Sequence, residues 1–320
     1  MSILHNIYSR KKLKLSILKK NEHRITLSFY KYFNIRNPYI FRDMIYTSFV
    51  KLNIFGRVYI AKEGINAQIN ILHNKISCLK KFLNKINKKF KNIHINSGLN
   101  TKQSFWMLQV KVRKQIVSDG LLNKNFDHHD TGIYVQIKNV NQMLYDPNVV
   151  FIDMRNDYEF VIGHFEHAVH VPGSTFRDQL KGIVGFLKKY KEKTLVLYCT
   201  GGIRCEKATS WLKYHNFKNV YHIQGGILNY VNESQKNNFP IKFKGKNFVF
   251  DHRMSERVSK HILGKCKTCQ IDCDDYINCR RDTCHDLFIQ CTVCQIKYNK
   301  YCSINCKKFD TKHPVYSIVK

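Results

Sequence analysis

Cys199 is the residue of this chain best placed for chemistry, because it joins a short apolar run, residues 194–198, to a glycine-containing loop. The loop closes with Arg204 and leads into a segment of helical character. A cysteine between a strand and a helix N-terminus lies where unpaired N–H groups and the helix dipole stabilise an anion. We therefore expect the pKa of the Cys199 thiol to fall from about 8.5 toward neutrality, with Arg204 adding a positive charge.

The length of this loop distinguishes between two chemistries. Four residues separate Cys199 from Arg204, whereas the loop of a cysteine phosphatase has one residue more, a spacing at which this chain has Cys205. The shorter loop, which contains Gly201 and Gly202, holds a tighter ring of N–H donors and suits a single sulfur better than a tetrahedral phosphate. The pattern resembles the rhodanese family, whose cysteine carries a persulfide. An inert buried cysteine at a strand end is the alternative interpretation.

Segments on both sides of the loop agree with a rhodanese-like domain. An apolar run ends in Asp153 and is followed by Arg155, and a glycine turn follows the apolar run at residues 220–223. Strand-like and helical segments alternate over residues 139–240, which predicts a parallel sheet flanked by helices. Such sheets bind ligands at the carboxyl ends of their strands, where the Cys199 loop would lie.

The charge of the chain indicates a polyanionic partner. The 320 residues contain 54 Lys and Arg against 23 Asp and Glu, a formal net charge of +31. The chain is also rich in Asn, Ile and Lys, so drift of the gene toward A and T codons is a second explanation. The candidate RNA-binding surfaces are a basic arm at residues 10–14 and a basic amphipathic helix within residues 74–90. On that helix we select Lys81, Lys85 and Lys88 as nucleic-acid-binding residues.

No apolar stretch approaches the ~20 residues of a membrane span, and the basic N-terminus lacks the apolar core of a secretory signal. We expect a cytoplasmic protein that does not interact with membranes. Its twelve cysteines should then be reduced, metal-bound or catalytic rather than paired in disulfides.

Nine of the twelve cysteines lie within residues 266–306 and indicate a separate C-terminal module. Two Cys-x2-Cys pairs, separated by 21 residues, each place two thiolates within reach of one tetrahedral ion, which predicts structural zinc. The ligands suffice for two sites, but the spacing does not give their pairing. Free thiols, or catalytic ones, are the alternatives. The candidate ligands are Cys266, Cys269, Cys273, Cys279, Cys284, Cys291, Cys294, Cys302 and Cys306.

The pattern of residues 1–112 predicts the order β-α-β-β-α-β of a ferredoxin-like α+β domain. In this domain Phe29, Tyr30 and Trp106 are interpreted as core residues rather than base-stacking platforms. The chain thus divides into this domain with its basic arm, a linker at 113–138, the α/β domain at 139–240 and the cysteine-rich module at 241–320.

With these three units in this order, the chain resembles the rhodanese-domain tRNA uridine hydroxylases over nearly its whole length. The residues that carry the resemblance are 56–68, 151–155, 198–208, 245–251 and 287–294. The resemblance implies an oxidoreductase that uses molecular oxygen to form 5-hydroxyuridine at the wobble position of a tRNA anticodon loop. It also implies that Cys199 is the reactive, persulfide-forming cysteine and that Arg204 is the loop-closing cation.

Three functions remain open at this point. In the first, the Cys199 thiolate attacks C6 of uracil and makes C5 reactive toward oxygen, while Arg204 stabilises the charge on the base. Cys205, Gly201, Gly202, Asp153 and Arg155 would be accessory, Cys205 by resolving an oxidised Cys199 or simply by packing in the core. The second is a persulfide sulfurtransferase for tRNA thiolation, with a sulfur or electron donor protein as partner. The third, a zinc-stabilised RNA-binding protein with an inert rhodanese domain, is disfavoured by the intact loop.

Overall fold

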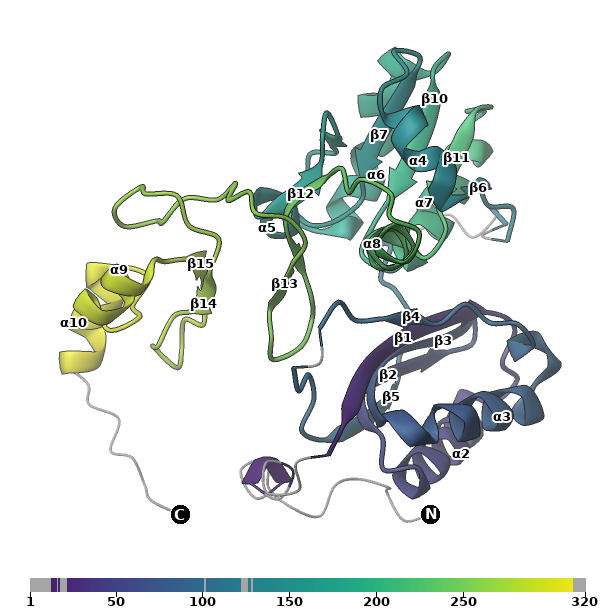
Figure 1. Ribbon diagram of the computed structural model, residues 1–320, viewed down its shortest axis with the longest axis horizontal. Coiled ribbons are helices and arrows are strands. Elements are labelled where there is room, and N and C mark those ends of the chain that lie inside the picture. Colours follow the sequence, from purple (N-terminus) through teal and green to yellow (C-terminus); the bar gives the residue numbers. More distant parts are fainter. Residues whose placement is uncertain are drawn as a thin grey trace.

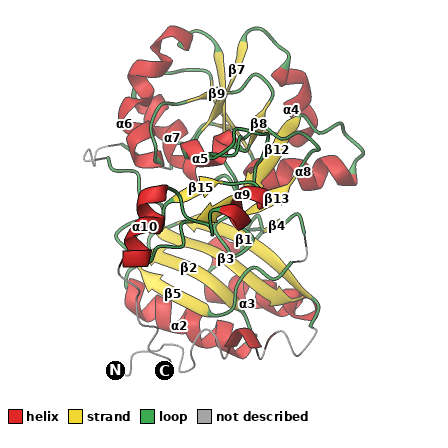
Figure 2. Cartoon of the chain, turned by 90° about the vertical axis from the view of Figure 1, so that its left-hand side faces the viewer, coloured by secondary structure: helices red, strands yellow, loops and turns green. Residues whose placement is uncertain are grey.

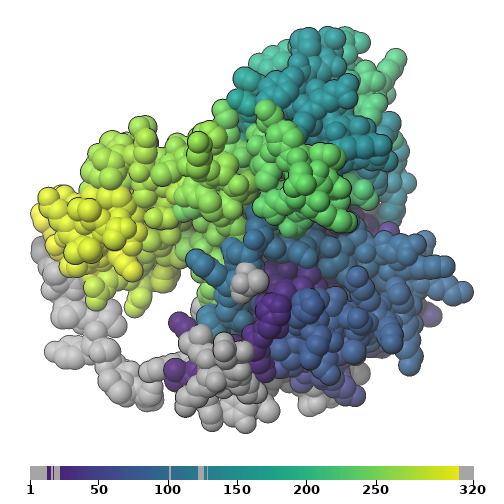
Figure 3. Space-filling view, in the orientation of Figure 1, coloured from purple at the N-terminus to yellow at the C-terminus, as the bar shows by residue number. Residues whose placement is uncertain are grey.

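The computed structural model describes residues 13–15, 17, 22–100, 102–121, 126, 127 and 129–312. They form three units in chain order, an N-terminal domain, a central α/β domain and a C-terminal cysteine-rich unit (Figure 1). Figure 3 shows the cysteine-rich unit, in yellow and light green, projecting to one side of the two larger domains. No described helix combines the length and apolar character needed to cross a lipid bilayer.

The N-terminal domain has the predicted ferredoxin-like architecture, extended by one strand. Its sheet has the order β4-β1-β3-β2-β5, in which β5 pairs in parallel with β2 and the other pairings are antiparallel. The strands are β1 (Arg24–Tyr32), β2 (Phe55–Ala61), β3 (Gly64–Leu72), β4 (Asn96–Ser97) and β5 (Leu108–Val112). The helices are α2 (Pro38–Lys51) and α3 (Ile76–Ile86), with short 3₁₀ turns at His73–Lys75 and Lys88–Phe90.

The two faces of this sheet have different neighbours. Helices α2 and α3 cover one face, where Leu79 and Leu83 of α3 pack in an apolar core with Phe29 of β1. Side chains alternate between faces along a strand, so the residues flanking Phe29 point to the opposite side. Figure 2 shows the helices below the sheet and the central domain above it. The face of the sheet that α2 and α3 do not cover is therefore directed toward the central domain, which contains the Cys199 loop.

The central domain is the predicted helix-flanked parallel sheet, of order β6-β11-β10-β7-β9. Its strands are β6 (Ile133–Val135), β7 (Val149–Asp153), β9 (Val169–His170), β10 (Thr194–Tyr198) and β11 (Val220–Ile223). Its helices are α4 (Ile137–Leu144), α5 (Asp157–Val161), α6 (Phe176–Leu187), α7 (Ile203–Tyr214) and α8 (Gly226–Lys236), with a 3₁₀ turn at Lys188–Tyr190.

The segment 113–138, expected to be a linker, is partly built into the fold. Strand β6 lies within it and pairs with β11, so the central sheet begins before residue 139. Ile116 and Asp119 are buried, and the Asp119 carboxylate receives a hydrogen bond of 2.6 Å from Lys207 of α7. The segment thus contributes contacts that join the first two domains.

The last unit begins with β12 (Phe243–Phe248), which pairs with both β8 (Gly163–Phe165) and β13 (Ser255–Arg257). Beyond it lie a hairpin and two helices, with most of the cysteines in the connecting loops. These elements are β14 (Tyr276–Asn278), β15 (Leu287–Ile289), α9 (Thr292–Lys297) and α10 (Ile304–Lys312).

Candidate active site and cysteine-rich unit

Cys199 follows β10 directly, and Gly202 precedes the first residue of α7. The Cys199 side chain is fully buried, and its Sγ accepts a hydrogen bond of 3.1 Å from the Gly202 N–H group. Burial alone would raise the pKa of the Cys199 thiol. The hydrogen bond from Cys205, the charge of Arg204 and the loop N–H groups outweigh burial and lower this pKa to about 6. At neutral pH the group is therefore mainly a thiolate, as the sequence predicts.

Arg204 is held in place by Glu159 of α5. Its two terminal nitrogens donate to the two Glu159 carboxylate oxygens at 2.6 and 2.9 Å, and both side chains are almost inaccessible to solvent. Although burial disfavours the charged guanidinium, the Glu159 carboxylate raises the pKa of Arg204 above its usual value. Glu159 also closes a capping box with Asn156 at the start of α5. Sequence reasoning missed Glu159, for which this capping spacing was the available signal.

Cys205 lies in the first turn of α7, fully buried in the core of the central domain. Its thiol hydrogen-bonds the sulfur of Cys199, and burial together with that thiolate raises the pKa of Cys205 well above its usual value. Cys205 is therefore a protonated donor to Cys199 as well as a packing residue.

Asp153 and Arg155 form a buried ion pair of 2.6 Å at the end of β7. Arg155 also donates to the Gly163 carbonyl at 2.5 Å, while its own carbonyl accepts a hydrogen bond of 2.7 Å from Gln179. Neither Asp153 nor Arg155 lines the cavity beside Cys199. Their contacts instead fix the polypeptide next to the Cys199 loop.

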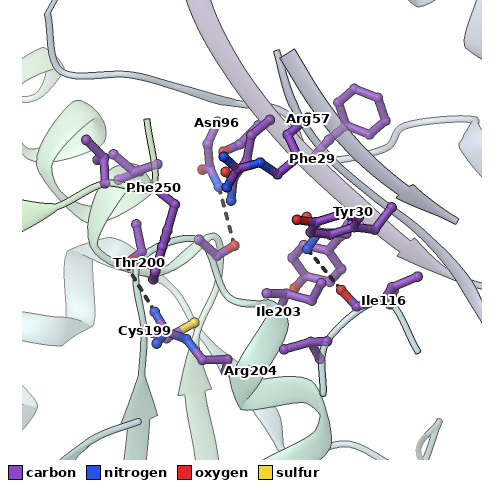
Figure 4. Close-up of a pocket in the computed structure, with 18 of the residues that line it drawn as sticks. Phe29, Tyr30, Arg57, Asn96, Ile116, Cys199, Thr200, Ile203, Arg204 and Phe250 are labelled. Carbon is purple, nitrogen blue, oxygen red and sulfur yellow. Dashed lines mark hydrogen bonds between the residues drawn. The ribbon is translucent and has the colours of Figure 1, made fainter. Parts of the chain in front are cut away.

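The Cys199 loop is the floor of a cavity of about 700 Å³ that lies between the domains (Figure 4). Cys199, Thr200 and Arg204 line one side, and the uncovered face of the N-terminal sheet lines the other. We call this face the cavity face, and its residues are Ser28, Tyr30, Arg57, Tyr59, Asn66 and Gln68. The interpretation of Tyr30 as a core residue is wrong, since its side chain is only partly buried and lies on the cavity face.

The cavity face approaches the loop so closely that Gly202 has no space for a side chain. Gly202 has a φ of 98°, and a Cβ atom there would lie 2.9 Å from the Tyr30 hydroxyl. The other loop glycine is Gly201. Its backbone carbonyl accepts a hydrogen bond of 3.4 Å from the side chain of Asn96, which lies on β4 of the N-terminal domain. The glycines thus allow the two domains to form one site.

The first turn of α7 connects the two domains through buried charges. The Glu206 carboxylate accepts hydrogen bonds from the hydroxyls of Tyr30 at 2.6 Å and Tyr134 at 2.7 Å. Lys207 is 1% exposed and forms ion pairs with Glu63 at 2.9 Å and Asp119 at 2.6 Å. Because α7 also begins at the reactive loop, these contacts fix the cavity face relative to Cys199.

Eight of the nine predicted metal ligands form two groups of four. Within each group the sulfur atoms lie within 4.8 Å of one another, and separations include 3.7 Å for Cys269–Cys291, 3.7 Å for Cys284–Cys302 and 3.5 Å for Cys302–Cys306. A tetrahedral ion with bonds of ~2.3 Å to sulfur requires separations of ~3.8 Å, so the residues fit such an ion. Cys273 lies outside both groups. The groups are Cys266, Cys269, Cys291 and Cys294, and Cys279, Cys284, Cys302 and Cys306.

The lysines selected for nucleic-acid binding are distant from the cavity. Lys81 and Lys85 lie on α3 and Lys88 on the following 3₁₀ turn, all exposed on the side of the sheet opposite the cavity face. The structure does not bring them together with Cys199. Of the basic arm, residues 10–12 lie outside the described part of the chain.

Comparisons with known proteins agree with this arrangement. Residues 24–116 match the family model described as UPF0176 acylphosphatase like domain, residues 136–233 the Rhodanese-like domain and residues 244–307 the Rhodanase C-terminal model. A tRNA uridine(34) hydroxylase of Buchnera aphidicola subsp. Acyrthosiphon pisum (strain Tuc7) is 50% identical over 308 residues, covering 96% of this chain and 95% of that protein. One of Photorhabdus laumondii subsp. laumondii is 46% identical over 309 residues, covering 96% and 88%. Identity at this level over nearly the full length shows that this chain belongs to the tRNA uridine(34) hydroxylase family.

Proposed function

We propose that this protein hydroxylates C5 of the wobble uridine in tRNA. Family membership supports the reaction and the substrate, since relatives at about half identity carry the name tRNA uridine(34) hydroxylase. The observation that supports a role for particular residues is the buried Cys199 thiolate. It lies beside a cavity of about 700 Å³, and the N-terminal domain lines the other side of that cavity. Ligand cavities of this size hold small molecules, and a single extruded nucleotide is of that class.

The proposed chemistry begins with the Cys199 sulfur, which adds to C6 of the uracil ring. A carbon–sulfur bond forms, and the electron pair of the C5–C6 double bond moves onto C5 and the adjacent O4 carbonyl. Arg204 and the loop N–H groups stabilise this negative charge, which is the role of preorganised donors in other acyl and enolate sites. After oxygen has been added at C5, loss of the C5 proton and departure of the thiolate restore the double bond.

The net reaction consumes one O₂ molecule as co-substrate. One oxygen atom ends on C5, and the other is reduced to water by two electrons and two protons. A donor of the dithiol class can supply both electrons and become a disulfide, which balances the reaction. We propose such a donor protein or small thiol as partner. Cys205 has a raised pKa, so it is a protonated neighbour rather than a second nucleophile.

We propose that the two cysteine groups each hold one structural zinc ion. Four thiolates close the coordination shell and leave no open position for a substrate, which is typical of structural sites. The described helices and strands of this unit are short, so metal coordination would provide much of its folding free energy. We further propose that the protein acts in the cytoplasm, where its cysteines stay reduced.

The persulfide sulfurtransferase is the competing function, because the loop resembles that of rhodaneses. Mass spectrometry of total tRNA nucleosides distinguishes the two functions. The nucleosides are taken from a strain that lacks this gene and is complemented with the normal or the Cys199→Ser chain. We expect 5-hydroxyuridine only with the normal chain. Thiouridine that depends on Cys199, without 5-hydroxyuridine, would favour the sulfurtransferase. Accurate mass and chromatography are needed because exchanging oxygen for sulfur and adding oxygen give the same nominal mass.

A further inference from the structure

The cavity face has two rows of polar side chains that run away from the reactive loop. Strand pairing places Ser28 opposite Gln68 and Gln68 opposite Arg57, and it likewise aligns Tyr30, Asn66 and Tyr59. The first member of each row lies next to the loop, since a Cβ atom on Gly201 would lie 4.0 Å from the Ser28 hydroxyl and one on Gly202 would lie 2.9 Å from the Tyr30 hydroxyl. Strands are ~4.8 Å apart, so Arg57 lies about two strand spacings, ~10 Å, farther out than Ser28.

At the outer end of these rows the cavity is lined by three cations without acidic partners. They are Arg57 on β2 and Arg113 and Lys114 just after β5, and β5 pairs with β2. No ion pair involves any of the three within the described residues. The acidic side chains lining the cavity, Asp251 and Glu256, are both already paired with Arg253 at 2.5 Å. The positive charge at the outer end is therefore available to an anion.

The middle of the first row has a free amide. The Gln68 carboxamide lines the cavity and has no hydrogen-bond partner among the described residues, whereas the neighbouring Asn66 donates to the Ile116 carbonyl at 3.2 Å. A carboxamide presents an N–H donor beside a carbonyl acceptor. The pairing edge of uracil presents the complementary N3–H donor beside a carbonyl acceptor, and RNA-binding proteins read extruded bases by such edges.

We propose that the cavity face is the nucleotide-binding wall of the site. Arg57, Arg113 and Lys114 bind the phosphodiester beside the target nucleotide, and Gln68 hydrogen-bonds the edge of its base while Cys199 lies below. The inference deepens the proposed function, on which it rests. It assigns RNA binding to the face of the N-terminal sheet toward Cys199 rather than to the lysines of α3.

The test measures binding without turnover, using the Cys199→Ser protein and a synthetic anticodon stem-loop with uridine at the wobble position. The triple variant Arg57→Gln, Arg113→Gln, Lys114→Gln should bind more weakly, and the slope of log K against log salt should fall by about 2 to 3. The charge-matched control is Lys188→Gln, Lys189→Gln, Lys191→Gln, which lies just before β10 and so at the opposite end of that strand from Cys199. It should bind as the parent does. A thermal midpoint equal to the parent's shows that each variant is folded.

A second arm separates the phosphate from the base. This arm adds a stem-loop that lacks the base of the wobble nucleotide. The triple cation variant should bind both stem-loops more weakly than the parent protein does. Gln68→Ala should weaken binding of the complete stem-loop only. Unchanged binding by the folded triple variant, or a loss caused instead by Lys81→Gln, Lys85→Gln, Lys88→Gln, would overturn this inference and leave the proposed function standing. If the parent protein bound no stem-loop, both would be wrong.

Discussion

The same residue type does two different things in two regions of this molecule. In the central domain one cysteine, Cys199, receives hydrogen bonds from backbone N–H groups and from a second thiol, next to an arginine. In the C-terminal unit eight cysteines point their sulfur atoms at one another in two groups of four. The first arrangement stabilises a single thiolate beside a cavity, whereas the second suits a metal ion that would occupy every thiolate.

The difference shows that the surroundings decide what a cysteine is used for. Around Cys199 the stabilising groups belong to a strand–loop–helix unit that folds without metal, and a second domain completes a cavity over the sulfur. Around the C-terminal groups there is little apolar packing beyond the cysteines themselves and a few aromatic and aliphatic neighbours. We therefore expect substitutions in the first region to affect chemistry and substitutions in the second to affect folding.

The largest effect on chemistry should come from Cys199→Ser. An alcohol without a general base is a poor nucleophile at neutral pH, so turnover should fall by ~10³-fold or more. Circular dichroism and RNA binding should be unchanged, because the hydroxyl has nearly the shape of the thiol. Substantial hydroxylation by the folded variant would rule out a covalent role for Cys199.

The largest effect on folding should come from a metal-ligand substitution such as Cys266→Ser. The zinc content measured by elemental analysis should fall from about two ions per chain to about one, because each group of four is expected to hold a single ion. Hydrogen exchange should rise over residues 264–294, while β7 and β10 keep their protection. Zinc-free protein with full protection in this unit would contradict a structural metal.

Substitution of Arg204 should give a smaller effect on chemistry, together with a loss of stability. Arg204→Gln should lower turnover ~10²- to 10³-fold and should also destabilise the fold, since it leaves the buried Glu159 carboxylate unpaired. The double variant Arg204→Gln, Glu159→Gln should recover stability in thermal denaturation but not activity. Recovery of both by the double variant would mean that the ion pair is only structural.

The pH dependence follows from the lowered pKa of Cys199. The thiolate is the reactive form and is lost by protonation as the pH falls through about 6, so kcat/KM should be level near pH 7 and decline below about pH 6. In Arg204→Gln this decline should begin at higher pH, because a positive charge that favours the thiolate is removed. A profile that is the same in both proteins would exclude titration of Cys199 as its cause.

The smallest effect is expected for Cys273, the cysteine of the C-terminal unit that lies outside both groups. Cys273→Ala should leave the zinc content at the value of the normal chain, in contrast to Cys266→Ser. Activity should also change little. Loss of a zinc ion in Cys273→Ala would show that Cys273 is itself a metal ligand, contrary to the two groups of four.

The sequence predicts the geometry of the Cys199 loop because its signals are local. Cys199, Gly202 and Arg204 lie within one strand–loop–helix segment, whose spacing predicts their geometry directly. The role of Glu159 is not predictable in this way, because its contact with Arg204 spans 45 positions in the sequence. Only its capping role is visible locally. The pairing of cysteines into groups likewise depends on the β14–β15 hairpin, which brings distant pairs together.

The contribution of the N-terminal domain was not predictable for a different reason. Alternation along β2 and β3 shows that Arg57 and Gln68 share one side of a sheet, but a polar side is normally the solvent side. Whether another domain faces it depends on contacts such as Lys207 with Glu63. The sequence also predicts a core position for Tyr30, although its side chain lines the cavity.

The central claim is that the Cys199 loop directs molecular oxygen to C5 of uridine in tRNA. Purified protein, tRNA from a strain lacking the gene and a dithiol reductant, incubated under oxygen-18 gas, test it most directly. We predict 5-hydroxyuridine that carries one oxygen-18 atom, with none formed by Cys199→Ser. Product whose added oxygen comes from water, or sulfur in place of oxygen on the uridine, would contradict the account.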